Sequence, residues 1–542
     1  MNNFLNRTNR LFLTQQRSIF TSAFILALMI LIARFFGFIR YRVFANFFTK
    51  EELDIFFASF RVPDLIFELL MTGAFTSCFI PLYLKYRNNQ NDLSKNISSI
   101  INFMILSMFV LISLLFIFSP LLISVITPGF NKSQVSVVIF YTRILLVSQL
   151  PFLILGNILI SIGQAERFFI MTSIAPIIYN LLTIVFVILF ARTLRLDAPV
   201  FGVVIGSLFF FLSQWWVIFK TNYRYQLILQ KTEGLREFIK ISIPRILTVF
   251  ISQIDATIDL SLSTLLGMGN YTIFYLAQHL QLLPVSVVGI SFGQAALPYL
   301  SEMVVNKKYK ELSENLSQSV LNIIYLVLPI SLIFIFARTP LVRLFFGGQK
   351  FDWSATVETA ITLSFFAISI PFHSLYYLIV RAFYSFLDTK TPFIFSVSGV
   401  LLNTFISLIF IIGFHLPVWS LAVSFSLTII LNTTILFLIL TKKVGVFKFK
   451  YFLNELLKIG ITALFCSFSS FLVLKLFDKL ILDTTRTINI FFLLGTVSVF
   501  FLTQYLLLSY FLNIKEIYIM IKLINKIKGV PKKIFEVYLN YE

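Results

Sequence analysis

The chain has 542 residues, of which 58% are hydrophobic and 13% are charged, and its mean hydropathy is +0.91. A water-soluble domain cannot hide so much apolar surface, because its outside has to remain in contact with water. The formal net charge of +20 would indicate a nucleic-acid partner in a soluble protein, but here we expect no nucleic acid and an all-α integral membrane protein.

Apolar segments of the length that crosses a bilayer, about 20 residues, follow one another along the chain. The first one follows Arg7, Arg10 and Arg17; it is longer than the core of a signal peptide and lacks a small-residue cleavage site, which predicts an uncleaved helix. About fourteen transmembrane helices are predicted, at 18–38, 55–82, 98–126, 134–162, 168–191, 199–219, 241–266, 271–300, 313–337, 355–384, 391–413, 417–441, 452–474 and 488–513.

The charges of the connecting loops predict the orientation of the chain. An even number of crossings places both termini on one side, and most loop Lys and Arg residues lie there, chiefly within 220–245, 442–450 and 515–533. Because Lys and Arg are concentrated in cytoplasmic loops, we expect both termini in the cytoplasm.

The longest loop between predicted helices, 220–240, separates six helices from eight. We therefore divide the chain into an N-terminal lobe at 1–222, a C-terminal lobe at 223–441 that begins with a basic amphipathic linker, a helix pair at 442–513 and a basic tail at 514–542. Within the linker, Leu235, Phe238 and Ile239 alternate with Arg236 and Lys240 as in a helix that lies at the membrane interface. The tail is expected on the anionic inner leaflet, with a solvated tail as the alternative.

Ionisable residues at membrane depth are costly and usually face a cavity or a partner. Arg34 interrupts the first predicted helix, and Arg40 follows six residues later, about 120° around the helix axis unless Gly37 bends it. Alternatively, Arg40 and Arg42 mark the end of the helix.

The second predicted helix carries a polar stripe. Asp54, Arg61, Asp64 and Glu68 are spaced by seven, three and four residues, so they fall within about 80° on one face, and Pro63 can kink the helix. This pattern favours a polar cavity, although ion pairs that tie helices together would give the same stripe.

The seventh predicted helix carries two acids one turn apart, Asp255 and Asp259. Two such carboxylates repel each other in a dry bundle unless one is protonated or a cation lies between them. Asn403, Thr404 and Ser407 of the eleventh helix could complete an oxygen cage for a monovalent cation, and protonated, hydrogen-bonded acids are the alternative.

The sequence offers little sign of a metal site, a disulfide or a catalytic motif. Cys78 and Cys466 lie in apolar surroundings, and His279, His373 and His415 have no metal-site spacing, so buried, satisfied side chains are the default. The sequence lacks a phosphate-binding loop, a zinc-protease motif and a nucleophile elbow. We therefore expect a transporter without a cofactor, driven by a membrane gradient of Na⁺ or H⁺, by a substrate gradient or by another protein.

Several motifs resemble one known family. The stretches A-R-F-F-G-F-I-R at 33–40, L-D-I-F-F-A-S-F-R-V-P-D at 53–64 and T-G-A-F-T-S-C-F-I-P at 72–81 look like the opening of the lipid II flippases called MurJ or MviN. Further similar stretches are T-P-G-F at 127–130, A-P-I-I-Y-N-L at 175–181, V-G-I-S-F-G-Q-A-A-L-P-Y-L-S at 288–301 and V-R-A-F-Y-S-F-L-D-T-K-T-P at 380–392. They occur in the family's order and cover most of the chain.

The resemblance implies the architecture of the MOP superfamily: two six-helix lobes around a central cavity, and two C-terminal helices that line a lipid-facing groove. It also implies a monomer in the bacterial cytoplasmic membrane, surrounded by lipids, that binds the diphosphate of a lipid-linked peptidoglycan precursor in a cationic cavity. Arg34 and Arg40 match two functional arginines of the family, Asp54 matches an acid before paired phenylalanines, and Arg61 matches a basic residue of the second helix.

The sequence departs from the family pattern at Phe67 and His279, where the family has arginines, and at Tyr41, where it has an acid. These changes lower the positive charge of the cavity. His279 is then either a substrate-binding residue in place of arginine or a packed, neutral side chain.

Together, these features predict substrate binding by Arg34, Arg40, Arg61 and His279. Asp54, Asp64 and Glu68 would pair with the arginines once the substrate has left. The alternatives are a cation-coupled drug antiporter, a flippase for another lipid-linked saccharide, a membrane glycosyltransferase and a structural scaffold. A glycosyltransferase would need an acid-rich or metal-binding external loop, which is missing, and a scaffold would not need Arg34.

Overall fold

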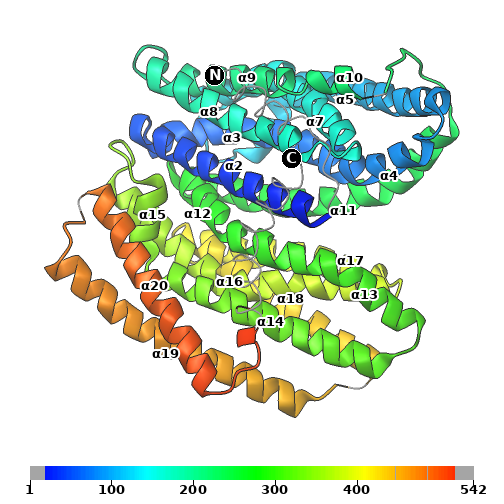
Figure 1. The fold of residues 1–542 in the computed structure, drawn as a ribbon. Coiled ribbons are helices and arrows are strands. Elements are labelled where there is room, and N and C mark those ends of the chain that lie inside the picture. Colours follow the sequence, from blue (N-terminus) through cyan, green and yellow to red (C-terminus); the bar gives the residue numbers. More distant parts are fainter. Residues whose placement is uncertain (1–18, 222, 446, 485, 519, 521–542) are drawn as a thin grey trace, which may run out of the picture. The chain divides into compact units, whose positions relative to one another are not determined.

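The computed structural model describes residues 19–221, 223–445, 447–484, 486–518 and 520, and every regular element among them is a helix (Figure 1). This agrees with the predicted all-α class. The chain forms two compact units, one made of residues up to 272 together with 345–352, the other of 273–344 and the residues from 353 onward.

Unit 1 contains the elements α2 (Ile19–Phe47), α3 (Lys50–Phe67), η1 (Glu68–Phe75), α4 (Thr76–Tyr86), α5 (Gln90–Ile126), α6 (Lys132–Ile144), η2 (Leu145–Gln149), α7 (Leu150–Ala165), α8 (Phe169–Leu194), α9 (Asp197–Leu212), α10 (Trp216–Lys220) and α11 (Glu233–Thr264). Residues 345–352 belong to it because this loop packs on the end of α2, where Phe351 N donates to the Ala45 carbonyl at 3.0 Å.

Unit 2 contains α12 (Asn270–Pro284) from residue 273 on, η3 (Val285–Ile290), α13 (Ser291–Val305), α14 (Tyr309–Phe336), α15 (Arg338–Phe346) up to residue 344, α16 (Trp353–Ser385), α17 (Lys390–Leu408), η4 (Ile409–Gly413), α18 (Trp419–Val444), α19 (Phe449–Leu480) and α20 (Thr487–Phe511). The last two helices are attached to this unit: the Tyr505 ring of α20 stacks on Tyr325 of α14 at 4.9 Å, and its hydroxyl donates to the Tyr325 carbonyl.

Twelve helices or continuous helical runs of the described residues are long and apolar enough to cross a membrane. Each of them coincides with one of the last twelve predicted segments. The first two predicted segments, 18–38 and 55–82, fall in α2 and in the α3–η1–α4 run, which are not among the twelve. The multi-pass architecture is therefore confirmed, whereas the number fourteen stays a prediction.

The ends of several helices follow from local sequence. Thr49 and Glu52 form a capping box at the start of α3, and Asn131 and Gln134 form another at the start of α6. Gly445 ends α18 in the left-handed conformation, with φ of 79°, which favours glycine.

Four π-helical turns interrupt the helices of the described residues. The turn η3 begins directly after Pro284, and η1 follows Pro63 by five residues. A proline within a helix removes a backbone donor, and one inserted residue changes the directions of the side chains that follow, so such turns are frequent at functional sites. Glu68 and Gln149 lie on two of these turns.

The predicted domain boundaries at 222, 441 and 513 stay a prediction. By its contacts, α11 belongs to unit 1. The expected interfacial helix is not a separate element. Its residues form the first turns of α11, and Leu235 and Phe238 are buried in unit 1, where the Phe238 ring lies 6.3 Å from that of Phe75. The preceding residues, 223–232, form neither helix nor strand.

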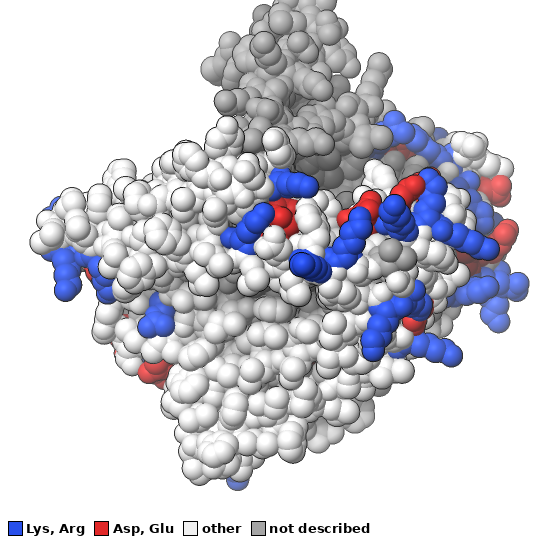
Figure 2. Space-filling model, turned by 90° about the horizontal axis from the view of Figure 1, so that it is seen from below, with Lys and Arg blue, Asp and Glu red and all other residues white. Residues whose placement is uncertain are grey.

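The molecular surface fits a membrane environment. Figure 2 shows charged side chains in separate groups on a surface that is otherwise broadly uncharged. On α19, for example, Leu464, Phe465 and Phe468 are each about three-fifths exposed, as side chains that face lipid would be. The residues of the predicted tail from 521 onward, and the arginines at 7, 10 and 17, lie outside the described residues.

Candidate functional site

The polar stripe of α3 has two different environments. Asp54, at its start, is completely buried, and its carboxylate accepts hydrogen bonds from the backbone N–H groups of Gly269 and Thr272, the latter at 2.7 Å. These groups belong to the first turn of α12, where unpaired donors and the helix dipole favour a negative charge. In this structure Asp54 therefore attaches α3 to the start of α12.

Arg61, two turns further on, is held by α11. Its Nη2 donates to the Gln253 carbonyl at 2.7 Å, to Gln253 Oε1 at 3.0 Å and to Thr257 Oγ1 at 2.7 Å, and its Nε also donates to Thr257 Oγ1. All of these acceptors are neutral. Within the described residues no carboxylate is hydrogen-bonded to Arg61, so neutral groups alone fix its position.

Two acids follow on the same face. Asp64 is exposed and interacts electrostatically with Arg61, Arg40 and Glu68. Glu68 is half-buried and is the first residue of η1. The structure thus brings together four of the predicted substrate-binding residues, two arginines and two acids, and separates Asp54 from them.

Arg40 lies among aromatic rings. Its guanidinium carbon is 5.2 Å from the centre of the Tyr41 ring, 5.9 Å from that of Phe44 and 5.4 Å from that of Tyr179 on α8. Cation–π contacts of this kind stabilise an arginine. The Tyr179 hydroxyl in turn accepts a hydrogen bond from Gln149 Nε2 at 3.1 Å.

Arg34 is exposed on α2, which continues without a break through Gly37. The bend at Gly37 that would bring Arg34 to Arg40 therefore stays a hypothesis. The neighbouring backbone is attached to α8, because Asn180 Nδ2 donates to the Ala33 carbonyl at 3.3 Å. A role of Arg34 in substrate binding stays a prediction.

His279, in unit 2, is half-buried and bonded to its own helix. Its Nδ1 lies 2.9 Å from the Tyr275 carbonyl, and its ring lies against the Tyr275 ring with 4.1 Å between centres. Because a carbonyl only accepts, Nδ1 carries the proton. This local bond is the one that the packed, neutral alternative predicts.

Sequence reasoning missed two polar groups within apolar helices. Besides Gln149 with Tyr179, unit 2 contains the buried Gln281, whose Nε2 donates to His373 Nδ1 at 3.0 Å and to Ser369 Oγ at 3.3 Å. The available signal was a glutamine amide within an apolar run, which is costly to bury unless it is hydrogen-bonded.

The proposed cation ligands occur in both units. Asp255 is half-buried and Asp259 buried on α11, in unit 1, whereas Asn403 and Ser407 are buried on α17, in unit 2, where Ser407 Oγ lies 2.6 Å from Ser424 Oγ. Among the residues described, no three His, Cys, Asp or Glu side chains group as metal ligands would. A monovalent cation bound by carboxylates and neutral oxygens stays a prediction.

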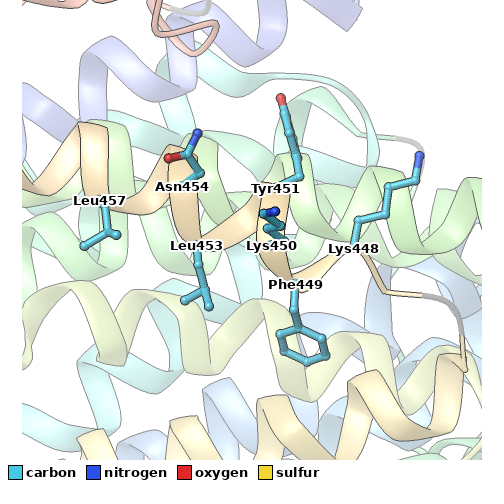
Figure 3. A pocket seen from close by; sticks show the side chains of 7 residues that line it. All are labelled: Lys448, Phe449, Lys450, Tyr451, Leu453, Asn454 and Leu457. Atoms are coloured by element: carbon cyan, nitrogen blue, oxygen red, sulfur yellow. The ribbon is translucent and has the colours of Figure 1, made fainter.

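A hollow of about 840 Å³ opens at the start of α19 (Figure 3) and is lined by Lys448, Phe449, Lys450, Tyr451, Leu453, Asn454 and Leu457. In Figure 3, Phe449, Leu453 and Leu457 point to one side of the helix, and Tyr451 and Asn454 to the other. The lining comes from one short segment and contains no acid. We interpret it as the place where an amphipathic helix enters the membrane rather than as the transport site.

Comparison with known proteins gives a consistent family assignment. Residues 44–510 match the family model described as "Lipid II flippase MurJ". A "Probable lipid II flippase MurJ" of Buchnera aphidicola subsp. Baizongia pistaciae is 26% identical, covering 88% of this chain and 93% of the relative, and one of Borreliella burgdorferi is also 26% identical, covering 88% and 94%.

Solved structures agree in fold. A lipid II flippase MurJ in an inward closed conformation superposes with a TM-score of 0.73 at 24% identity, covering 90% of this chain and 98% of the other. A multidrug-resistance MATE transporter of the MOP superfamily, in an inward-facing conformation, reaches 0.65 at 14% identity, covering 76% and 94%. The antiporter class therefore shares the fold but is the more distant of the two.

Proposed function

The chain belongs to the lipid II flippase MurJ family, and we propose that it carries lipid II, the undecaprenyl-diphosphate-linked precursor of peptidoglycan, from the inner to the outer leaflet of the bacterial cytoplasmic membrane. It is a multi-pass membrane transporter and not an enzyme. The proposed substrate, direction and membrane also imply a role in cell-wall synthesis.

One observation carries the binding part of this proposal: Arg61 is oriented by neutral acceptors alone and retains its charge for a ligand. A diphosphate headgroup that crosses the bilayer loses water, and each unsatisfied polar group then costs several kcal/mol. Arginine remains charged when buried and offers a planar fork of donors to phosphate oxygens. The lipid tail can remain in the bilayer.

Release of the headgroup requires another partner for the arginines. Asp64 interacts with both Arg40 and Arg61, and Glu68 interacts with Asp64. We propose that these acids pair with the arginines when the site is empty and that the diphosphate displaces them. His279 and Arg34 would contact the same headgroup.

The driving force is also part of the proposal. Asp255 and Asp259, with Asn403 and Ser407, would bind Na⁺ or a proton, so that ion movement drives the cycle. We further propose that the protein acts as a monomer with both termini in the cytoplasm.

Depletion of the protein in its own cells tests the substrate. Lipid II should accumulate in the inner leaflet, and a copy of the parent gene should reverse this. Accumulation of a different lipid-linked saccharide would indicate the related flippase, and no accumulation together with drug sensitivity would indicate the antiporter.

A further inference from the structure

The segment between α10 and α11 forms an irregular strap, residues 223–231, which lies beside α5 in unit 1 (Figure 1). The backbone groups of a surface loop are usually hydrogen-bonded to water unless protein side chains bind them. The strap is held at several points.

Side chains of α5 bind the backbone of the strap. Asn102 Nδ2 donates to the Gln226 carbonyl at 3.0 Å and to the Ile228 carbonyl at 2.8 Å, and Asn102 Oδ1 accepts from the Tyr225 hydroxyl. One turn earlier, Ser98 Oγ accepts from Gln226 N at 3.0 Å and lies 2.8 Å from the hydroxyl of the buried Tyr223. The strap is thereby fixed in one register on α5.

This register presents apolar side chains outward. Leu227 and Leu229 are exposed, Leu227 to 88%, whereas the half-exposed Tyr225 is turned toward α5, where its hydroxyl bonds Asn102. Arg224 and Lys231 are exposed near the two ends. In water, exposure of these leucines would stabilise nothing. Apolar side chains flanked by basic ones are instead suited to an anionic membrane surface.

The position of the strap along α5 agrees with this. The first exposed large apolar side chain of α5 is Leu106, one turn after Asn102. At 1.5 Å per residue, the strap is therefore about 6 Å outside the level at which α5 begins to expose apolar side chains. A position about 6 Å outside the apolar part of α5 corresponds to the headgroup layer.

We propose that the strap is a lipid-binding surface, in which Leu227 and Leu229 insert into the headgroup layer of an anionic leaflet while Arg224 and Lys231 bind lipid phosphates. The proposal depends on the membrane location of the chain and not on its substrate. Basic residues close to an anionic leaflet gain electrostatic attraction, and the apolar side chains lose contact with water.

Spin labelling measures the depth of the strap directly. Leu227→Cys is labelled with a nitroxide and the protein reconstituted in vesicles of phosphatidylcholine with phosphatidylglycerol; the native Cys78 and Cys466 are buried. Glu233→Cys, exposed on the first turn of α11, is the matched control. At position 227 we expect severalfold less collision with an aqueous nickel complex and more with oxygen than at 233. Leu229→Cys gives a second readout.

Equal access of the nickel complex at 227, 229 and 233 would overturn the proposal and leave an aqueous surface for a protein partner. The charge contribution has its own test. Replacing both basic residues, Arg224→Gln with Lys231→Gln, should remove the deeper insertion seen with phosphatidylglycerol relative to phosphatidylcholine alone. If the label at position 227 lies at the same depth in both lipids while Arg224 and Lys231 are present, the anionic-lipid assignment is wrong.

Discussion

Arg61 on α3 donates from Nη2 to the main-chain carbonyl of Gln253 on α11 at 2.7 Å, so a backbone atom fixes the position of this cationic group. A backbone acceptor cannot swing away as a side chain can. The guanidinium can therefore exchange anionic partners while its own position is retained.

Arg61→Lys keeps the charge but removes the fork and most of the bonds to α11. Since a charge-assisted hydrogen bond contributes about 1.5–3 kcal/mol, transport should fall by roughly 10- to 100-fold while insertion into the membrane is retained. Arg143→Lys is the control, because Arg143 donates to Ser119 Oγ at 2.9 Å and lies over the Phe116 ring, away from the stripe. Equal transport by both variants would argue against a phosphate-binding Arg61.

Asp54→Asn tests whether this acid supports the fold. Asparagine replaces one of the two accepting carboxylate oxygens by an NH₂ group, so the backbone N–H of either Gly269 or Thr272 loses its acceptor. A buried N–H without an acceptor costs about 1–3 kcal/mol. We expect a lower melting temperature in detergent without substrate, and little change for Glu51→Gln on the same helix. An unchanged melting temperature with lost transport would instead assign Asp54 to the substrate.

Gly129→Ala should destabilise unit 1. A Cβ at this position would lie 1.9 Å from the Thr264 carbonyl oxygen, a backbone atom that cannot move without shifting the end of α11. Overpacking of this kind costs about 1–3 kcal/mol. Gly495→Ala is the matched control, because its added Cβ has no packing neighbour within 4 Å outside the local backbone of its own helix. In thermal unfolding, the melting temperature of Gly129→Ala should fall below that of the parent, and that of Gly495→Ala should stay close to it.

Asp388, in the loop before α17, gives a pH-dependent contribution. Burial raises the pKa of this carboxyl, but hydrogen bonds from Lys443 at 2.6 Å and from Thr391 outweigh burial, and its pKa lies below the ordinary 3.8. An acid with a lowered pKa stabilises the fold above its unfolded-state pKa, and this stability is lost as pH falls through the folded-state pKa.

Asp388→Asn should therefore be less stable than the parent at neutral pH, and the difference should shrink as the carboxyl is titrated in acid. Because this titration lies below the ordinary pKa of 3.8, melting temperatures measured from pH 7 down to about pH 2 check this. A difference that stays constant over the range would mean that the charge of Asp388 contributes nothing.

Much of the fold could be predicted because hydropathy is a local property. Twelve predicted segments coincide with helices, and the capping boxes at Thr49 and Asn131 could be recognised from neighbouring residues. The strap could not be predicted, since it depends on Asn102 meeting the backbone of residues far along the chain. Leu235 and Phe238 suggested an interfacial helix because a sequence does not show which apolar face is covered by packing.

The site was predictable to a similar extent. The spacing that placed Arg61, Asp64 and Glu68 on one face follows from helix geometry. That Asp54 would instead bind the start of α12, and that Arg40 would meet the ring of Tyr179, depended on tertiary contacts between segments more than a hundred residues apart.

Transport of lipid II is measured in vesicles reconstituted with the purified protein. Lipid II with a fluorescent headgroup is placed in the inner leaflet of vesicles that contain the protein, and a quencher is added outside. We predict quenching over time with the parent protein, much slower quenching with Arg61→Lys, and no transport of a lipid-linked saccharide with an unrelated headgroup. Quenching no faster than in protein-free vesicles, with correctly folded protein and an imposed Na⁺ or H⁺ gradient, would contradict the proposed function.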